Sequence, residues 1–390
     1  MTGTYPAEAV VDLDAVTANV AALVEHARGA AVMAVVKGDG YGHGAVPCAR
    51  AALRGGATWL GVAQLSEAVA LRAAGIDAPL LTWLYAPDQD LAPAVASGVD
   101  LSVAAPWALD AVVGAARATG RTAGIHLKVD TGLARGGATA EGWPDLVKAA
   151  AAAQADEAVD VVGVWSHYAN ADIPFHPSVK AQSESLLEAV DVATRHGLRP
   201  QLRHHANSAA TLTDPSSHFD LVRPGLAVYG LSPVPDVGGP ERFGLRPAMT
   251  LRAKLVLVKD VAAGQGVSYG YSYVTTRRTT LALVPLGYAD GIPRHASDTG
   301  PVRLAGRRLT VAGRVCVDQF VLDVGRLDPD VTAGDEVVLF GPGDDGEPTA
   351  QDWADAAGTI SYEIVTRLGD RIPRVYVGKD AEVLVSGSPA

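Results

Sequence analysis

The segment Ala31–Gly44, with the sequence AVMAVVKGDGYGHG, combines a lysine, a tyrosine and a histidine with closely spaced glycines. Its first part is a valine-rich apolar run without alternation, which is typical of a strand buried on both faces. Lys37 stands where this strand ends, so its amino group is poorly solvated, and desolvation lowers the pKa of a lysine. The resulting free amine is the form that a Schiff base requires.

The glycines after Lys37 permit positive φ angles and a close approach of the backbone to a ligand. A solvated lysine followed by a flexible turn is the simpler interpretation of a Lys-Gly pair. Tyr41 and His43, which alternate with glycine, are unnecessary in such a turn. The segment therefore favours a functional site.

Composition and charge narrow the class of protein. The 390 residues are 48% hydrophobic and 19% charged, which is typical of a globular chain of two domains. A net charge of −11 argues against binding to nucleic acid or to an anionic membrane. We expect neither a secretion signal in the first residues nor a membrane span. Cys48 and Cys316 lack metal-ligand spacing, so we predict a cytoplasmic protein without a metal site.

Short apolar runs alternate with alanine-rich helical patterns through the first part of the chain. This alternation predicts an α/β fold, a (β/α)8 TIM-type barrel, although a doubly wound open sheet would give the same pattern. The runs are Ala31–Val36, Trp59–Ala63, Pro79–Trp83, Asp100–Val103, Ile125–Asp130, Val161–Trp165, Leu202–His205 and Asp220–Val222. The helical patterns between them include Gln64–Ala74, Trp107–Ala118, Ala140–Gln154 and Pro177–His196.

Polar residues recur where the predicted strands end. Barrel active sites are assembled in this way, from the carboxyl ends of several strands. No GxGxxG follows the first strand, as a dinucleotide-binding open sheet would require. Both observations favour the barrel. The residues follow the first, fifth, sixth, seventh and eighth strands and are Lys37, Arg135, His167, Asn207 with Ser208, and Arg223.

A second, mainly β domain is predicted after a linker. The segment Pro233–Pro247 is rich in proline and glycine, which is typical of a connection between domains. Strand-like runs separated by turn residues then follow at Thr250–Val258, Thr280–Pro285, Leu309–Val311, Phe320–Val324 and Glu336–Phe340. We therefore predict a barrel over residues 1–240 and a mainly β domain over residues 241–390.

Two neighbouring loops suit an anion. Ser208 begins a helical pattern, where unpaired N–H groups favour an anion, although an N-cap serine is also common. The next strand end carries Arg223 and a glycine-containing turn at Gly225–Leu226. Such pairs of loops form the phosphate site of many barrels. Lys128 is a separate anomaly, because a lysine inside the apolar run IHLKVD is costly unless it is paired or neutral.

Together these motifs resemble those of alanine racemases. The match includes the Lys37 segment, VDTGLARG, WSHY, HHANS, DLVRPGLAVYG, GVSYGYSY, LGYADG and RVCVDQF, and it runs in order from Lys37 to Tyr362 over nearly the whole chain. Each motif alone is weak, but the ordered set is specific. The resemblance implies a pyridoxal 5'-phosphate cofactor that is bound covalently by Lys37.

The resemblance also assigns the remaining cofactor contacts. It places His167 against the cofactor ring and against Arg223, whereas His126, His204 and His205 are interpreted as hydrogen-bonded core residues. The assigned cofactor-binding residues are Lys37, Tyr41, His167, Asn207, Ser208, Arg223, Gly225, Leu226 and Tyr362, with the phosphate on Tyr41, Ser208, Tyr362 and the backbone of Gly225 and Leu226.

By this resemblance Arg223 faces the pyridine nitrogen, and that choice has a chemical consequence. An arginine remains a cation and cannot accept the pyridinium proton. The ring nitrogen then stays unprotonated, and the cofactor is a weaker electron acceptor than one paired with a carboxylate. We expect this pairing to disfavour transamination.

Racemisation requires proton transfer on both faces of the substrate, for which two bases are the simpler design. By resemblance these are Lys37 and Tyr269, the tyrosine entering from the partner subunit of a head-to-tail homodimer. Because tyrosine is a poor base at its usual pKa of about 10, nearby positive charge must lower that pKa. His167 and Arg223 are the groups predicted to supply it.

The resemblance assigns substrate contacts to Arg135, Val317, Asp318 and Tyr288. Arg135 orients the carboxylate, the second domain of the partner contributes Val317 and Asp318, and Tyr288 lines the entrance. Family members commonly have methionine where this chain has Val317, which trims the wall of the pocket. Lys128 matches a lysine that is carbamylated in many relatives, and we expect its carbamate to hold Arg135.

The predicted function is the interconversion of L-alanine and D-alanine, which supplies D-alanine for peptidoglycan. A racemase of another small amino acid such as serine is an alternative, and a protective role against an alanine mimic would use the same activity. A decarboxylase of the same plan is disfavoured by Arg223. A non-catalytic pyridoxal-phosphate carrier is a further alternative, but it would have no use for a second domain with Tyr269 and Asp318.

Overall fold

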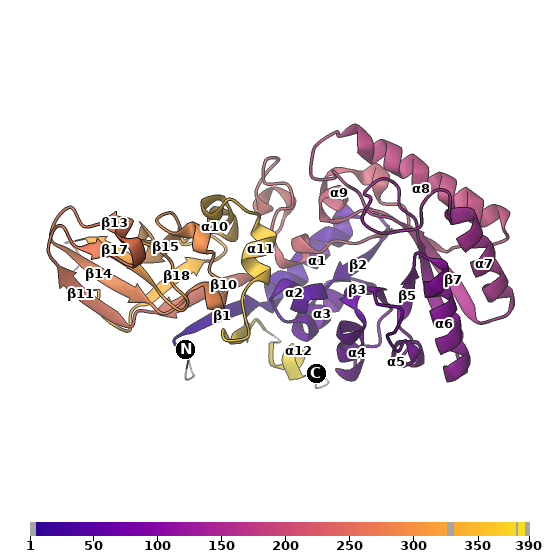
Figure 1. Cartoon of the computed structure of the whole chain (residues 1–390), viewed down its shortest axis with the longest axis horizontal. Coiled ribbons are helices and arrows are strands. Elements are labelled where there is room, and N and C mark those ends of the chain that lie inside the picture. The colour runs from indigo at the N-terminus through magenta and orange to yellow at the C-terminus, as the bar shows by residue number, and fades with distance from the viewer. Residues whose placement is uncertain (1–4, 326–330, 380, 387–390) are drawn as a thin grey trace. The chain divides into compact units, whose positions relative to one another are not determined.

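The computed structural model describes residues 5–325, 331–379 and 381–386, and over these ranges the chain forms two compact units (Figure 1). The barrel unit comprises Ala15–Gly40, Ala45–Leu245 and the described residues from Val383 onward. The second unit comprises the described residues up to Asp14, the short segment Tyr41–Gly44 and Arg246–Glu382. Each unit is therefore discontinuous in sequence.

An eight-stranded sheet forms the centre of the barrel unit, in the order β8-β7-β6-β5-β4-β3-β2-β9. All neighbouring strands are parallel, which confirms the predicted fold class. The strands are β2 (Ala31–Val35), β3 (Trp59–Gln64), β4 (Leu80–Leu84), β5 (Asp100–Val103), β6 (Ala123–Lys128), β7 (Val159–Trp165), β8 (Leu202–His204) and β9 (Leu221–Val222).

The two ends of this strand order, β8 and β9, are joined by hydrogen bonds. The amide of Asp220 donates to the carbonyl of Arg203 at 3.1 Å, and the amide of Arg223 donates to the carbonyl of Ala206 at 2.9 Å. The Asp220 carboxylate also accepts from the Arg203 amide and guanidinium at 2.8 and 2.7 Å. These bonds close the sheet into a barrel.

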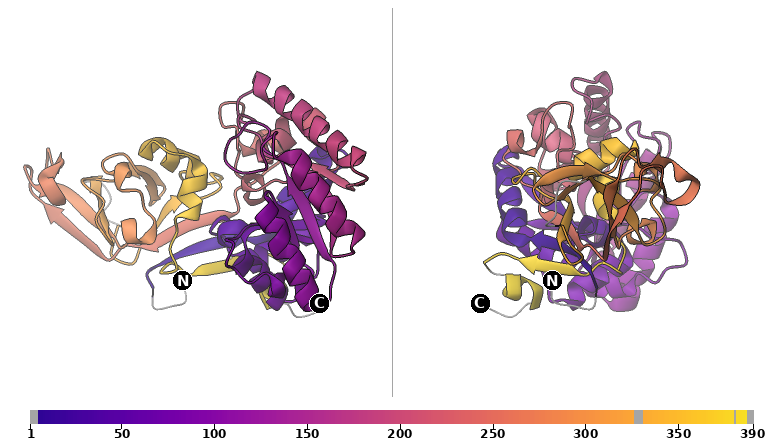
Figure 2. Two further views of the ribbon diagram at one scale, coloured as in Figure 1. Left: turned by 45° about the vertical axis from the view of Figure 1, so that its right-hand side comes forward. Right: turned by 90° about the vertical axis from the view of Figure 1, so that its left-hand side faces the viewer.

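Helices surround the strands on the outside, as α6, α7 and α8 do beside β5 and β7 in Figures 1 and 2. Proline in the first turn starts α6, α7 and α8, because that position needs no amide donor. The longer helices are α1 (Leu13–His26), α3 (Ala45–Arg54), α4 (Leu65–Ala73), α6 (Pro106–Thr119), α7 (Trp143–Ala155) and α8 (Pro177–Arg195); α2 (Lys37–Tyr41), α5 (Ala92–Ala96) and α9 (Ser208–Thr213) are short.

The second unit is mainly β, as predicted, and its largest sheet begins with a strand that the sequence did not reveal. Strand β1 (Ala7–Asp12) pairs with β10 on one side and β19 on the other. The other elements are β10 (Met249–Lys254), β11 (Leu257–Val261), β12 (Gly266–Val267), β13 (Tyr273–Val274), β14 (Thr279–Val284), β15 (Pro301–Leu304), β16 (Arg307–Thr310), β17 (Phe320–Gly325), β18 (Glu336–Phe340), β19 (Arg374–Val377), α10 (Ala350–Ala357) and α11 (Ser361–Thr366). The residues of α12 (Ala381–Ser386) are divided between the two units.

The single strand predicted over Thr250–Val258 is wrong, because the chain changes sheets within it. β10 belongs to the sheet β16-β15-β18-β10-β1-β19, whereas β11 belongs to the sheet β11-β14-β17. At the change, the Leu255 amide donates to the Asp335 carbonyl and the Val256 amide donates to the Leu283 carbonyl. The run TLRAKLVLV contains no glycine or proline at Leu255–Val256, so its composition gave no sign of the switch.

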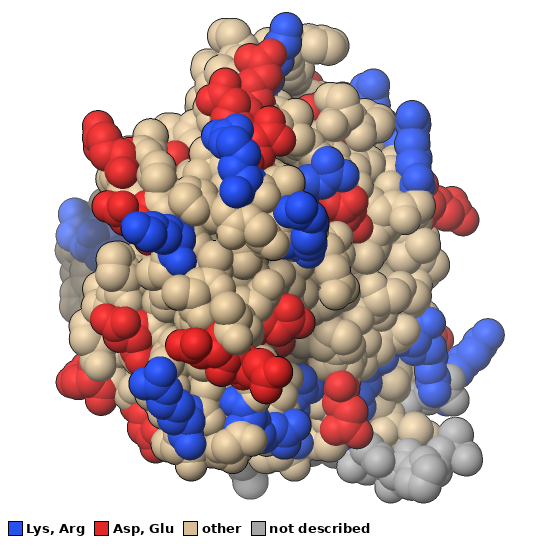
Figure 3. Space-filling view, turned by 90° about the vertical axis from the view of Figure 1, so that its right-hand side faces the viewer, with Lys and Arg blue, Asp and Glu red and all other residues tan. Residues whose placement is uncertain are grey.

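Charges of both signs are mixed on one face of the molecule. On the face shown in Figure 3, Lys and Arg side chains are interspersed with Asp and Glu, and neither sign forms a continuous patch. Within the described part of the chain, no helix has both the length and the apolar character needed to cross a bilayer.

Candidate active site

Lys37 lies at the carboxyl end of β2 and is followed by a left-handed turn. The φ angles are 61° at Gly38, 51° at Asp39, 60° at Gly40 and 53° at Tyr41. Glycine adopts such angles readily, whereas Asp39 and Tyr41 each cost about 1 kcal/mol or more. The strain is concentrated beside the lysine, and backbone strain of this kind clusters at functional sites.

The carboxylate of Glu67, in the first turn of α4, holds this turn in place. Its Oε1 accepts from the Gly38 amide at 2.6 Å, and its Oε2 accepts from the Ala63 and Gln64 amides at 2.9 Å each. The sequence indicated only a helix start at Glu67. Nothing in the local pattern pairs this carboxylate with a loop 29 residues earlier, so its role was missed.

The amine of Lys37 is desolvated, as expected. Burial lowers its pKa, and the charges of Arg135 and Arg223 lower it further, while Glu67 raises it. The free-amine form is therefore more accessible than in an exposed lysine.

Lys128 ends β6, and a loop from Asp130 to Ala138 folds back over it. The Asp130 carboxylate accepts from the Gly132 and Ala134 amides at 2.9 and 3.1 Å, which fixes the turn that precedes Arg135. The loop returns where the Ala138 amide donates to the Lys128 carbonyl at 2.9 Å. The exposed side chain of Arg135 thus belongs to the same short loop as Lys128.

Burial lowers the pKa of Lys128 to about 8, and the positive charges of Arg223 and Arg135 contribute to the shift. This value is consistent with the expectation that a lysine in that apolar run would be hard to keep charged. A substantial fraction of such an amine is neutral near physiological pH.

Two tryptophans form an aromatic floor beneath the cations. The Lys128 ammonium lies 4.3 Å and the Arg223 guanidinium 4.7 Å from the ring centroid of Trp165, and Lys37 Nζ lies 5.8 Å from that of Trp83. The two indole rings are 6.0 Å apart. Their faces carry negative charge density, so they offset part of the repulsion among the cations. The sequence analysis did not assign either tryptophan a function.

Arg223 is buried and held on several sides. Its Nη2 donates to the Ser166 carbonyl at 2.7 Å and lies 3.3 Å from Nδ1 of His167, and its Nη1 lies 3.1 Å from Nδ1 of His204. Burial lowers the pKa of Arg223 to about 9, which leaves it a cation at neutral pH. Its side-chain hydrogen bonds with the described residues use Nη1 and Nη2, so the Nε–H is among the donors that can serve a ligand.

Ser208 and the loop after β9 converge, as the sequence suggested for an anion site. The Ser208 hydroxyl accepts from the Gly225 and Ala227 amides at 2.8 and 3.3 Å. The N-cap of α9 is Asn207, whose Oδ1 accepts from the Ala210 amide at 3.0 Å. Ser208 is therefore not the N-cap. Because its oxygen accepts from both amides, its own O–H proton remains to be donated to an anion.

In the second unit, three loops are fastened together: residues 268–271, 287–290 and 314–318. The hydroxyl of Ser268 donates to the Arg314 carbonyl at 2.7 Å, and the Tyr288 amide donates to the Cys316 carbonyl at 3.0 Å. Tyr269 directly follows Ser268, and Val317 and Asp318 directly follow Cys316. The two bonds therefore hold the segments that carry these predicted residues close together.

The predicted residues on these loops are exposed. The exposed fractions of the side chains are 72% for Tyr269, 44% for Tyr288 and 50% for Val317. A Cβ added at Gly270 would lie 3.1 Å from the guanidinium carbon of Arg314, so this guanidinium lies against the backbone of the residue that follows Tyr269.

The two tyrosines predicted for the phosphate also meet within the second unit. The ring centroids of Tyr41 and Tyr362 are 6.3 Å apart. Burial raises the pKa of Tyr41 far above its usual value, so its hydroxyl stays protonated and is suited to donating a hydrogen bond.

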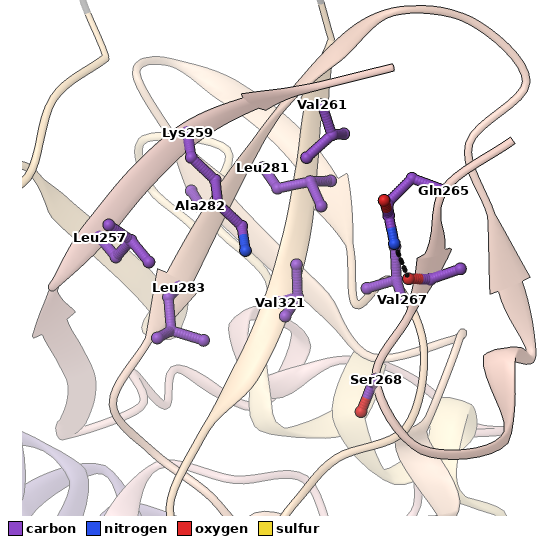
Figure 4. Close-up of a pocket in the computed structure, with 11 residues that line it drawn as sticks. Leu257, Lys259, Val261, Gln265, Val267, Ser268, Leu281, Ala282, Leu283 and Val321 are labelled. Atoms are coloured by element: carbon purple, nitrogen blue, oxygen red, sulfur yellow. Dashed lines mark hydrogen bonds between the residues drawn. The ribbon is translucent and has the colours of Figure 1, made fainter. Parts of the chain in front are cut away.

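A separate pocket of about 250 Å³ lies in the second unit, against β11, β14 and β17 (Figure 4). Lys259 is its one titratable lining residue among those described, so the pocket offers no acid–base pair and we do not take it for the active site. Its lining is Leu257, Lys259, Val261, Gln265, Gly266, Val267, Ser268, Leu281, Ala282, Leu283 and Val321.

The barrel unit therefore combines a desolvated lysine, a cluster of cations and an oriented serine hydroxyl at the carboxyl ends of its strands. This combination defines a barrel enzyme suited to a phosphorylated carbonyl cofactor held by a lysine. Residues 11–233 match the family described as "Alanine racemase, N-terminal domain", and residues 248–376 match "Alanine racemase, C-terminal domain". The chain belongs to the alanine racemase family.

Individual relatives agree. The chain is 63% identical over 369 residues to an alanine racemase of Frankia casuarinae, covering 95% of this chain and 96% of that protein. It is 59% identical over 372 residues to one of Thermobifida fusca, covering 95% and 98%. Its structure matches the crystal structure of alanine racemase from D-cycloserine-producing Streptomyces lavendulae with a TM-score of 0.94 and 56% identity, covering 96% and 98%.

The family depends on pyridoxal 5'-phosphate, and the residues of the barrel unit fit this group. The Ser208 O–H, oriented by the two amides that donate to its oxygen, suits a phosphate oxygen. The Nε–H of Arg223 suits an unprotonated ring nitrogen, and the lowered pKa of Lys37, caused first by burial, suits attachment to a carbonyl.

The Glu67 contact generates a prediction about Lys37. Glu67→Gln removes the charge that raises the pKa of Lys37 and leaves one amide oxygen to replace a carboxylate that accepts three hydrogen bonds. We expect the pKa of Lys37 to fall further and the protein to lose about 1 kcal/mol of stability. Labelling of Lys37 with an amine reagent across pH, read by mass spectrometry after removal of the cofactor, would then saturate at lower pH.

Glu188→Gln is the matched control, because Glu188 is exposed on α8 and the substitution makes the same change in charge. A labelling curve for Glu67→Gln that coincides with the control, or that moves to higher pH, would contradict the role of Glu67.

Proposed function

We propose that this protein interconverts L-alanine and D-alanine with pyridoxal 5'-phosphate and thereby supplies D-alanine for peptidoglycan. The observation that carries the proposal is the desolvated Lys37, whose pKa is lowered by burial and by Arg135 and Arg223 at the mouth of the barrel. Relatives named alanine racemase at 59–63% identity over nearly the whole chain support the substrate.

In this proposal the cofactor is held by the barrel residues described above. Lys37 binds it covalently, Ser208 with the backbone of Gly225 and Leu226 holds the phosphate, and Arg223 donates to the ring nitrogen. Tyr41, Tyr362, Asn207 and His167 remain the further predicted cofactor residues. When bound, pyridoxal phosphate supplies the electron-accepting ring that makes the Cα proton removable.

The protein's own groups move the proton and hold the substrate. The Nζ of Lys37 takes or returns the proton on one face of Cα, and the Tyr269 hydroxyl acts on the other face. Arg135 orients the substrate carboxylate.

We further propose a head-to-tail homodimer in the cytoplasm, in which the second domain of each subunit completes the site of the other. Exposed aromatic and apolar side chains at Tyr269, Tyr271, Tyr288 and Val317 support this assembly, because aromatic residues are enriched in interfaces. Tyr269, Val317, Asp318 and Tyr288 are the residues that this domain would contribute.

The test of the proposed function is deuterium exchange in heavy water. Purified protein should incorporate deuterium at Cα of L-alanine while optical rotation is lost, because a proton removed from one face is replaced from solvent on the other. L-serine is the parallel substrate, since Val317 trims the pocket wall. Comparable turnover of serine would show that the enzyme is not specific for alanine. A bound cofactor without exchange on either amino acid would instead favour a non-catalytic pyridoxal-phosphate carrier.

Tyr269→Phe tests the second base. We expect cofactor binding to persist and racemisation to fall at least a hundredfold, because a positioned base typically contributes that much. Tyr271→Phe is the matched control, since Tyr271 is a similarly exposed tyrosine of the same loop, at 67%. Equal activity of the two variants would exclude Tyr269 as a base.

An active site shared between two subunits can be tested by mixing two inactive variants. Lys37→Ala and Tyr269→Phe are each expected to be inactive, yet mixing them should restore about a quarter of wild-type activity, since half of randomly mixed dimers are hybrids with one intact site. Failure of the mixture to regain activity, with hybrids demonstrated by mass, would contradict the shared site.

We also propose that Lys128 is carbamylated and that the new carboxylate holds Arg135. The Lys128 amine adds to dissolved carbon dioxide and releases one proton, so only the free amine reacts. Because burial, Arg223 and Arg135 lower its pKa to about 8, the modified fraction should rise as pH increases through that value. Carbon-13 NMR with labelled bicarbonate should show one carbamate signal that Lys128→Arg lacks. An identical spectrum for the wild type and Lys128→Arg would exclude carbamylation of Lys128.

A further inference from the structure

A chain of hydrogen bonds runs through the barrel from Arg223 to Asp100. Nη1 of Arg223 lies 3.1 Å from Nδ1 of His204, Nε2 of His204 lies 2.8 Å from Nδ1 of His126, and Nε2 of His126 lies 3.2 Å from Oδ2 of Asp100. The residues come from β9, β8, β6 and β5 and their ends. The two histidines are fully buried, and the Asp100 side chain is 18% exposed.

The guanidinium at one end of this series of hydrogen bonds and the carboxylate at the other fix which atom donates in each bond. An arginine only donates, so Nδ1 of His204 must accept and its proton sits on Nε2. His204 then donates to Nδ1 of His126, whose own proton sits on Nε2 and is donated to the carboxylate of Asp100. Burial, then the charge of Arg223, holds the pKa of His204 well below its usual value, consistent with a neutral ring.

Two glycines make room for these groups. A Cβ at Gly124 of β6 would lie 2.2 Å from Oδ1 of Asp100, and a Cβ at Gly163 of β7 would lie 2.7 Å from Nδ1 of His126. Glycine inside a strand weakens it and often marks a close approach of another group. The strands are therefore adapted to the Asp100 carboxylate and the His126 ring.

Aromatic rings enclose the same chain. Trp165 stacks on His204 with the ring planes 7° apart, and Trp59 meets His126 edge-on at 5.4 Å. These contacts hold both imidazoles in the orientation that the hydrogen bonds need and keep water away from them. A hydrogen bond in such a dry environment is stronger than one in water.

We propose that Asp100, His126 and His204 form a directed relay that orients Arg223 and supplies it with a distant counter-charge, so that Asp100 and His126 are positioning residues for the cofactor ring. The proposal rests on the proposed function, in which Arg223 faces the ring nitrogen. The carboxylate matters because Lys37, Arg135 and the unmodified amine of Lys128 offer Arg223 no negative charge.

The first test needs no substitution. Long-range proton–nitrogen correlation on holoenzyme with nitrogen-15 histidine should show His126 and His204 as neutral rings protonated on Nε2. Loss of each signal in His126→Phe and His204→Phe assigns them. A ring protonated on Nδ1, or on both nitrogens, would overturn the relay.

The second test compares Asp100→Asn with Asp160→Asn in the holoenzyme. Asn keeps an oxygen for His126 but removes the charge, and Asp160 is an exposed carboxylate on the neighbouring part of the sheet, opposite Gly124. For Asp100→Asn we expect shifted ring N–H signals of both His126 and His204, a shifted absorbance of the bound cofactor and about tenfold faster cofactor loss. Asp160→Asn should match the wild type in all three.

A purely structural role for Asp100 would give a different result. If Asp100→Asn lowers the melting temperature but leaves the His204 signal and the cofactor absorbance at the values of Asp160→Asn, the relay is wrong. This outcome can be distinguished from a failure of the proposed function. A protein that binds the cofactor without racemising alanine would still give the His204 signal and the cofactor absorbance. A protein that binds no cofactor would still reveal the tautomers.

Discussion

The barrel mouth depends on holding several cations together in a place with little water. Burial lowers the pKa values of Lys37 and Lys128, and the charges of Arg135 and Arg223 lower them further, so keeping both lysines charged opposes folding. The tryptophan faces, the backbone carbonyls around Arg223 and the Glu67 carboxylate offset part of that cost. An anionic ligand would offset more of this cost. The cations that destabilise the protein without a ligand are therefore suited to binding a phosphorylated cofactor.

The same constraint explains where the backbone is unusual. The left-handed turn after Lys37 places two residues with side chains at positive φ, and Glu67 stabilises it through a charge that also raises the pKa of Lys37. One carboxylate thus sets both the position and the electrostatics of the lysine. At Gly124 and Gly163 the missing side chains leave room for the Asp100 carboxylate and the His126 ring inside the barrel. The interior of such a barrel is usually filled by apolar side chains.

The sequence predicted the eight barrel strands and the strand-end positions of Lys37, His167, Ser208 and Arg223, because local periodicity and strand ends are recorded in neighbouring residues. It did not predict β1, whose partners β10 and β19 lie far along the chain, nor the change of sheet at Leu255–Val256. Glu67, Trp165 and the buried histidines were likewise treated as ordinary helix-start and core residues. Their roles arise from contacts between distant segments, for which a single sequence carries no local signal.

The choice of arginine at Arg223 constrains more of the barrel than its own position. Because a guanidinium only donates, His204 must present a bare Nδ1, and the proton order then follows through His126 to a carboxylate. A carboxylate in place of Arg223 would require the opposite order with neutral rings, which would leave Nε2 of His126 as an acceptor facing the acceptor oxygen of Asp100. An exchange of Arg223 for a carboxylate therefore conflicts with groups on three other strands, so the choice of residue at this position is constrained across the barrel.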